Sequence, residues 1–225
     1  MTPVNRQALI GILRTLAILL AVIFLPVWTL RWWQGWACLA AFIIPASMIT
    51  LWVARHDPAL LERRVNAGPN AEKEKGHKIV QTITAIVFPA DFGIPALDHR
   101  LGWSHVPSWA ASLGVLMMVF GFLVVFYVLK ANSYASSIIE VMADQRVIST
   151  GPYAFVRHPL YTGALISLFG IPLALGSWWG VLVNVPMSAA IIWRLLDEER
   201  FLVEKLPGYV DYLESVRYRL VPLVW

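Results

Sequence analysis

Four apolar stretches of membrane-spanning length constrain the fold of this chain more than any other feature. They run over Ala8–Leu30, Trp36–Ala54, Ile79–Leu97 and Trp109–Leu129, and each is bounded by charged or tryptophan-rich ends. About 20 apolar residues are enough to cross the hydrocarbon core of a bilayer as a helix. Each stretch therefore predicts one transmembrane helix.

A further apolar region, Leu160–Leu196, is long but interrupted by Gly170, Pro172 and the sequence Gly176-Ser177-Trp178. These residues predict two shorter helices that fold back on each other at the Gly176-Ser177-Trp178 turn. The predicted fold class is an all-α integral membrane protein, with four transmembrane helices followed by a C-terminal helical hairpin. The chain would then cross the membrane six times.

The composition supports a membrane protein and leaves no room for a separate soluble domain. The 225 residues are 58% hydrophobic and 14% charged, and the mean hydropathy is +0.64. A soluble domain could not cover so much apolar surface with polar residues. Any active site must therefore be built from helix ends and loops.

Basic residues predict the orientation of the helices, because cytoplasmic loops of membrane proteins carry an excess of Lys and Arg. With the N-terminus in the cytoplasm, only Arg31 and Arg100 of the eighteen basic residues fall on the outer side. We therefore expect a multi-pass protein with both termini cytoplasmic. The net charge of +4 follows from this topology, and we expect no nucleic-acid partner.

The sequence predicts no metal site. Cys38 is the only cysteine, so neither a disulfide nor a thiolate cluster can form within one chain. His56, His77, His99 and His105 are scattered over loops without the spacing of metal ligands.

Two segments of the N-terminal half differ from regular spans and short loops. The loop Arg55–Lys78, with its charge run at 72–75, is expected to be a solvated segment near lipid headgroups. The span Ile79–Leu97 contains Pro89, Asp91 and Pro95, which indicates a kinked or re-entrant helix. Asp91 would then either face a substrate cavity or lie in an interfacial break.

Residues with chemical potential begin after the fourth helix, so we place a domain boundary between 1–131, the N-terminal transmembrane helices, and 132–225. The polar segment Asn132–Arg157 contains Gly151-Pro152-Tyr153 and leads into Arg157-His158-Pro159. Proline suits the first turn of a helix, and the free amides of that turn form a site for a carboxylate or phosphate.

The last apolar helix ends in a second polar motif. Arg194 and Glu198 are four residues apart, so they share one helix face, and Glu199 follows directly. Adjacent carboxylates can accept hydrogen bonds from ribose hydroxyls or attract a sulfonium or ammonium group. Tyr209 and Tyr212, beyond the helix, are expected to pack the C-terminal segment onto the bundle.

These motifs together resemble the isoprenylcysteine carboxyl methyltransferase and phospholipid methyltransferase superfamily of integral membrane enzymes. The resemblance covers 132–222 and rests on the order of Arg157-His158-Pro159, the helical hairpin, Glu198-Glu199, Pro207-Gly208-Tyr209 and Arg219-Leu220-Val221-Pro222. It implies that 132–225 is a methyltransferase core.

The resemblance implies a cytoplasmic site for S-adenosylmethionine and a lipophilic acceptor that arrives from the bilayer. It also implies roles for residues that match the motifs. Arg194 and Glu198 would be catalytic, with Arg194 facing the acceptor, and the cofactor would be bound by Tyr153, His158, Tyr161, Glu198 and Glu199.

The chemistry leaves the acceptor open. A carboxylate acceptor is already ionised, so alignment and desolvation could supply most of the rate. An amine acceptor, as in phospholipid N-methylation, would need a base such as Glu198, Glu199 or His158. The alternatives from other classes are an NADPH-dependent, sterol-reductase-like membrane enzyme and a non-enzymatic membrane protein.

Overall fold

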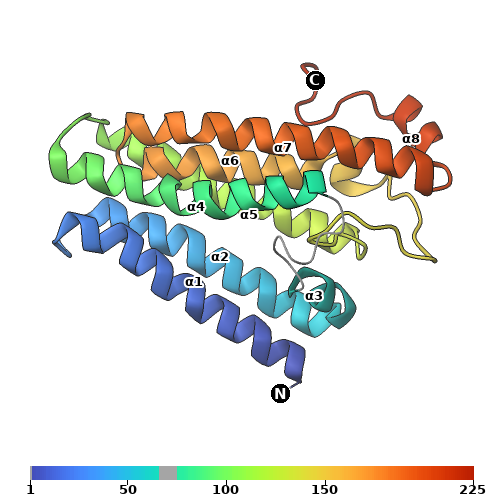
Figure 1. Ribbon diagram of the computed structural model, residues 1–225, viewed down its shortest axis with the longest axis horizontal. Helices are drawn as coiled ribbons and strands as arrows, with labels where there is room; N and C mark the ends of the chain where they lie inside the picture. The colour runs from blue at the N-terminus through green and yellow to red at the C-terminus, as the bar shows by residue number, and fades with distance from the viewer. Residues whose placement is uncertain (1, 66–74) are drawn as a thin grey trace.

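The computed structural model describes residues 2–65 and 75–225, and these ranges form an all-helical fold (Figure 1) without a β-strand. In chain order the elements are α1 (Pro3–Val27), α2 (Trp33–His56), α3 (Pro58–Val65), α4 (Lys75–Leu101), α5 (Ser108–Ala131), the 3-10 helix η1 (Gly151–Ala154), α6 (Pro159–Ala174), α7 (Trp178–Lys205) and α8 (Tyr209–Ser215).

Five helices in this part of the chain are long and apolar enough to cross a membrane, namely α1, α2, α5, α7 and the Lys78–Leu101 part of α4. The shorter apolar helix α6 packs between its neighbours α5 and α7. The predicted fold class, with four transmembrane helices and a C-terminal helical hairpin, is therefore confirmed, and the protein is a multi-pass membrane protein.

One detail of the hairpin prediction was wrong. α6 is short, with 16 residues, but α7 continues for 28 residues. The apolar pattern stops near Leu196, whereas the helix does not, because the polar residues that follow are good helix formers. The turn itself lies where it was predicted: Gly176 has φ +79°, and the Ser177 hydroxyl accepts a hydrogen bond from the Gly180 amide.

α4 is a continuous helix through Pro89 and Pro95, so neither the re-entrant segment nor the interfacial break is found. Membrane helices tolerate such prolines because neighbouring helices and side chains can satisfy the backbone groups that a proline leaves without a partner. Asp91 is fully buried inside the bundle. It lines neither of the two cavities described below.

Glycines bring α5 and α6 into close contact. A Cβ atom added at Gly170 would lie 2.6 Å from the Gly114 carbonyl oxygen, and one at Gly163 would lie 2.8 Å from the Gly121 carbonyl oxygen. Small residues of this kind allow backbones in a membrane bundle to approach closely. The contact places the end of α5 beside the start of α6.

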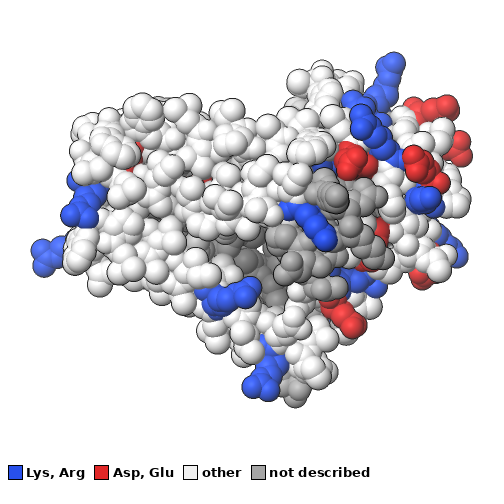
Figure 2. All heavy atoms as spheres, viewed as in Figure 1, with Lys and Arg blue, Asp and Glu red and all other residues white. Residues whose placement is uncertain are grey.

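The long helices define two ends of the molecule. Figure 2 shows that charged side chains gather at the end that carries α3 and α8, while most of the remaining surface in that view is uncharged. The predicted solvated loop is partly folded there, since α3 buries Leu60 and Leu61. Glu72, Lys73 and Glu74 of the predicted charge run lie outside the described residues.

Candidate active site

A pocket of about 110 Å³ lies at the charged end of the bundle. Its walls come from the segment 132–148, η1, the start of α6, the end of α7 and α8. Its polar lining includes Asn132, Tyr134, Glu140, Tyr153, Arg157, His158, Tyr161, Arg194, Glu198 and Tyr209. The structure therefore brings together the two polar motifs that the sequence singled out.

The tail of the chain holds the start of α6 in place. The amides of Arg157 and His158 donate to the carbonyls of Tyr218 and Arg219, each at 2.9 Å. The Thr162 hydroxyl donates to the Leu220 carbonyl at 2.8 Å. Two features therefore fix the start of α6: Pro159 at its first position, and the hydrogen bonds to the C-terminal tail.

Glu199 is a buried carboxylate with three basic partners. Its Oε1 lies 3.2 Å from both Arg157 Nε and His158 Nε2, and its Oε2 accepts a hydrogen bond from Arg219 Nε at 2.8 Å. Glu199 is absent from the residues that line the pocket, whereas Arg157 and His158 are among them. Its contacts thus position both basic side chains at the pocket wall.

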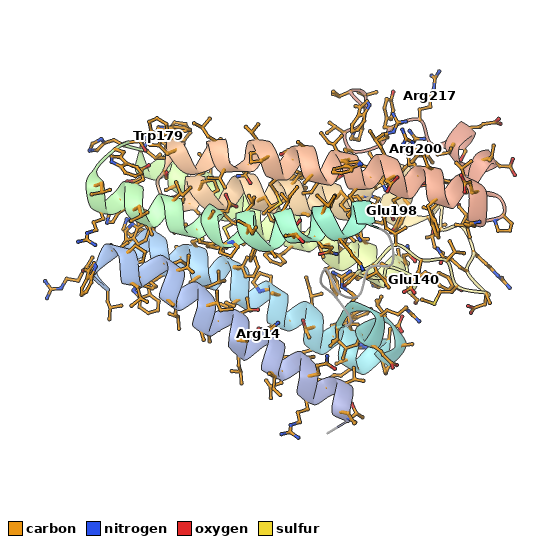
Figure 3. The ribbon with its side chains drawn as sticks, in the orientation of Figure 1. Arg14, Glu140, Trp179, Glu198, Arg200 and Arg217 are labelled. Carbon is orange, nitrogen blue, oxygen red and sulfur yellow. The ribbon has the colours of Figure 1, made fainter. Side chains whose placement is uncertain are left out.

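Glu198, the neighbour of Glu199, lines the pocket itself. The Tyr161 hydroxyl donates to Glu198 Oε2 at 2.6 Å and accepts a hydrogen bond from Arg194 Nε at 3.1 Å. This chain of carboxylate, phenol and guanidinium spans α6 and α7. In Figure 3, Glu198 lies on the side of α7 that faces the segment carrying Glu140, whereas Arg200 lies nearer Arg217.

Tyr153 contributes to the pocket through a hydroxyl that accepts a hydrogen bond from Asn132 Nδ2 at 2.8 Å. Burial raises the pKa of Tyr153 to about 12, so its phenol stays neutral at physiological pH. The Tyr212 hydroxyl donates to the Tyr153 carbonyl at 2.8 Å. This hydrogen bond links α8 to η1.

The packing role expected for Tyr209 and Tyr212 is confirmed, because both are buried in one apolar cluster with Leu206 and Val216. Tyr209 also has a feature that the sequence did not indicate. Its hydroxyl is buried without a hydrogen-bond partner in the structure, and the residue lines the pocket. An unsatisfied buried hydroxyl is costly, which makes it a candidate ligand contact.

Residues 109–207 match the family model described as phospholipid methyltransferase. This phospholipid methyltransferase segment covers 99 of the 225 residues. The match confirms the superfamily resemblance inferred from the motifs. No curated protein matches the chain.

The phospholipid methyltransferase segment starts in α5, earlier than the predicted core boundary at 132, and ends just after α7. It contains Tyr153, His158, Tyr161, Arg194, Glu198 and Glu199. Tyr209 and the tail that orders the start of α6 lie beyond it. The roles of the individual residues stay predictions from the motif.

Two arginines of α3, outside the phospholipid methyltransferase segment, hold the 132–148 segment that forms one wall of the pocket. Arg63 Nη2 donates to the Ser133 carbonyl at 2.6 Å, and Arg64 Nη1 donates to the Ala135 carbonyl at 3.3 Å. The Ser137 hydroxyl donates to the Arg64 carbonyl at 2.9 Å. The sequence indicated only a topological role for these arginines, since about 70 residues separate the partners and no spacing relates them.

Proposed function

We propose that the protein transfers a methyl group from S-adenosylmethionine to a lipophilic acceptor at the cytoplasmic membrane face. The match of residues 109–207 to the phospholipid methyltransferase family supports a methyltransferase. The observation that carries the proposal is the Glu198–Tyr161–Arg194 chain, which lines a pocket beside the first turn of α6 at the end of the membrane helices.

The pocket has the donors and acceptors that S-adenosylmethionine requires. Glu198 would accept hydrogen bonds from the ribose hydroxyls, and Arg157 with His158 would bind the carboxylate near the first turn of α6. The unpartnered Tyr209 hydroxyl would gain a partner. When bound, the cofactor would supply a sulfonium methyl group: an electron pair of the acceptor would bond to the methyl carbon as the carbon–sulfur bond breaks, and S-adenosylhomocysteine would leave.

The size of the pocket requires a movement. Ligand pockets have volumes of about 300–1,000 Å³, and this pocket has about 110 Å³. The segment 133–148 forms one wall and has no helix of its own. We infer that this segment moves outward when the cofactor binds, while α6 and α7 keep their positions.

For an amine acceptor, the contacts of the two carboxylates favour Glu198 over Glu199 as the base. Glu199 already contacts three basic side chains, and its loss would disturb His158 as well. Glu198 lines the pocket and could receive the proton from an ammonium group that loses it before or during transfer. Arg194 would pair with an anionic group of the acceptor.

The acceptor class has two candidates. The family description favours a phospholipid amine, whereas the resemblance in the C-terminal motifs also points to a prenylcysteine-type carboxylate. A screen with methyl-labelled cofactor would separate them: label that stays non-volatile after base treatment indicates N-methylation, and label that base releases as methanol indicates a methyl ester.

The orientation of the site follows from the charges. Six helices that cross the membrane in alternating directions place α3, the segment 132–158 and α8 at the same end as both termini. In this topology, Arg31 and Arg100 are the only two of the eighteen basic residues in the sequence that fall in loops on the opposite side. By the positive-inside rule we propose that it faces the cytoplasm.

Calorimetry of the protein in lipid nanodiscs would test the cofactor. We expect S-adenosylhomocysteine to bind and NADPH not to bind, and we expect Glu198→Ala and His158→Ala to abolish binding while the fold survives. Glu204→Ala, an exposed glutamate outside the pocket lining on the same helix, is the matched control. Binding of NADPH alone would indicate a reductase, and binding of neither nucleotide would overturn the proposal.

A further inference from the structure

A second, larger cavity lies between α1, α2 and α3. Its volume is about 530 Å³, and Phe88 of α4 and Leu129 of α5 complete its inner wall. Figure 1 shows α1 and α2 diverging from the other long helices toward the end that carries α3. Apart from Leu129, the described lining lies outside the segment that matches the methyltransferase family.

The wall that α1 contributes is a continuous helical stripe. Gln7, Gly11 and Arg14 follow one another at spacings of four and three residues, and Thr15 lies four residues after Gly11, which places them on one helix face. A Cβ atom added at Gly11 would meet nothing within 4 Å. The cavity is therefore open space next to the helix backbone.

The charge of this cavity has one sign. Arg14 and Arg64 line it, and its described lining contains neither Asp nor Glu. Arg14 lies about 17 Å along α1 from the start of the helix, by the rise of about 1.5 Å per residue, and Figure 3 shows it in the middle of α1. An arginine inside a membrane span is costly unless it contacts an anion or water.

The remaining lining is mainly apolar, with Phe42, Ile43, Ala46 and Ile49 among the residues from α2. A cavity that combines an apolar wall with two guanidinium groups matches a molecule with a hydrocarbon chain and an anionic group. Polar amides or free amines would leave the arginines without a counter-charge.

An apolar cluster lies between this cavity and the candidate cofactor pocket. Val53, Leu61 and Leu129 line the cavity and pack in one cluster with Ala135 and Leu160, which line the pocket. Arg64 spans the same boundary. It lines the cavity, while its Nη1 donates to the carbonyl of Ala135 on the pocket side.

We propose that this cavity, lined by Gly11, Arg14, Ala46 and Arg64, receives an anionic amphiphile, with its carboxylate or phosphate at the arginines and its chain against α1 and α2. The proposal rests on the methyltransferase function and assigns the acceptor chamber to the N-terminal helices. Arg64 would hold the anionic group beside the wall of the cofactor pocket.

Photolabelling in nanodiscs would test this inference with three probes that carry the same diazirine-bearing chain: tetradecanoate, tetradecyl phosphate and tetradecylamine. We expect the two anionic probes to label α1 and α2 residues of the cavity, and the amine to label them much less. Comparison of tetradecanoate with tetradecyl phosphate shows which anion the site prefers. Labelling by all three probes alike would overturn the anionic assignment.

Substitutions in the cavity test whether the labelling depends on it. Gly11→Phe fills the open space and should abolish cavity labelling, whereas Leu13→Phe, at an exposed residue of the same helix that does not line the cavity, should leave it unchanged. Arg14→Gln and Arg64→Gln should each weaken labelling about tenfold, as expected for loss of one charge-assisted hydrogen bond. Labelling that persists in Gly11→Phe would overturn the cavity as the binding site.

Binding of S-adenosylhomocysteine separates this inference from the proposed function. We expect Gly11→Phe to bind the nucleotide like the wild type, because Gly11 is not part of the cofactor pocket. Loss of nucleotide binding in every form of the protein, with cavity labelling intact, would contradict the methyltransferase function but not the amphiphile site.

Discussion

The glycines at the α5–α6 contact and Gly11 of α1 have opposite surroundings. At Gly114, Gly121, Gly163 and Gly170 in α5 and α6, an added Cβ would collide with the backbone of the facing helix, whereas at Gly11 in α1 it would meet nothing. The close contact holds the start of α6 and the end of α5 rigidly beside the candidate active site. The open side leaves a cavity at α1 and α2. The α5–α6 contact therefore fixes the geometry of the candidate active site, whereas α1 and α2 leave space for a ligand.

The largest effect is expected where the glycines are closest. Gly121→Leu would push its side chain into Gly163 and Ser167 of α6. Overpacking typically costs about 1–3 kcal/mol, and we expect more here because the obstacle is backbone. We expect little monodisperse protein on size exclusion in detergent. Gly11→Leu is the matched control, and a stable Gly121→Leu protein would show that the α5–α6 contact is looser than described.

The next largest effect concerns the buried carboxylate behind the pocket. Glu199→Ala leaves Arg157, His158 and Arg219 without their shared counter-charge, and breaking a buried ion pair costs about 3–5 kcal/mol. We expect a large drop in the melting temperature of the detergent-solubilised protein. Glu204→Ala should melt like the wild type; an equal effect of both substitutions would refute the structural role of Glu199.

A smaller effect, on function alone, is expected from Tyr161→Phe. It removes the hydroxyl between Glu198 and Arg194 without creating a charge or a cavity. We expect binding of S-adenosylhomocysteine to weaken about tenfold, the usual effect of losing a hydrogen bond to a charged group. The melting temperature without ligand serves as the control. A change in melting temperature with unchanged binding would make Tyr161 a packing residue.

The smallest effect is expected from Gly11→Leu. The new side chain enters open space, and leucine is a better helix former than glycine by almost 1 kcal/mol. Thermal unfolding should show unchanged or slightly higher stability. A marked loss of stability would mean that α1 packs against α2 at this position, and the contrast with the α5–α6 contact would disappear.

The sequence predicted most of the membrane architecture and both polar motifs. Arg194 and Glu198 could be paired because helix periodicity relates residues four apart. Tyr161 lies on another helix, so its hydrogen bonds to both residues required the α6–α7 packing. The Tyr209 hydroxyl at the pocket and the contacts of Arg63 and Arg64 with 133–137 gave no local signal.

By itself, the sequence determined that the chain spans a membrane, where its helices run and which residues gather at the charged end. These properties depend on the free energy of transferring each segment into a bilayer, which is a sum over local residues. Only the tertiary structure decided that Glu199 lies behind the pocket while Glu198 lines it, and that α1 and α2 enclose a cavity. Adjacent residues on a helix point in different directions, so their separate surroundings depend on which helices pack against each face.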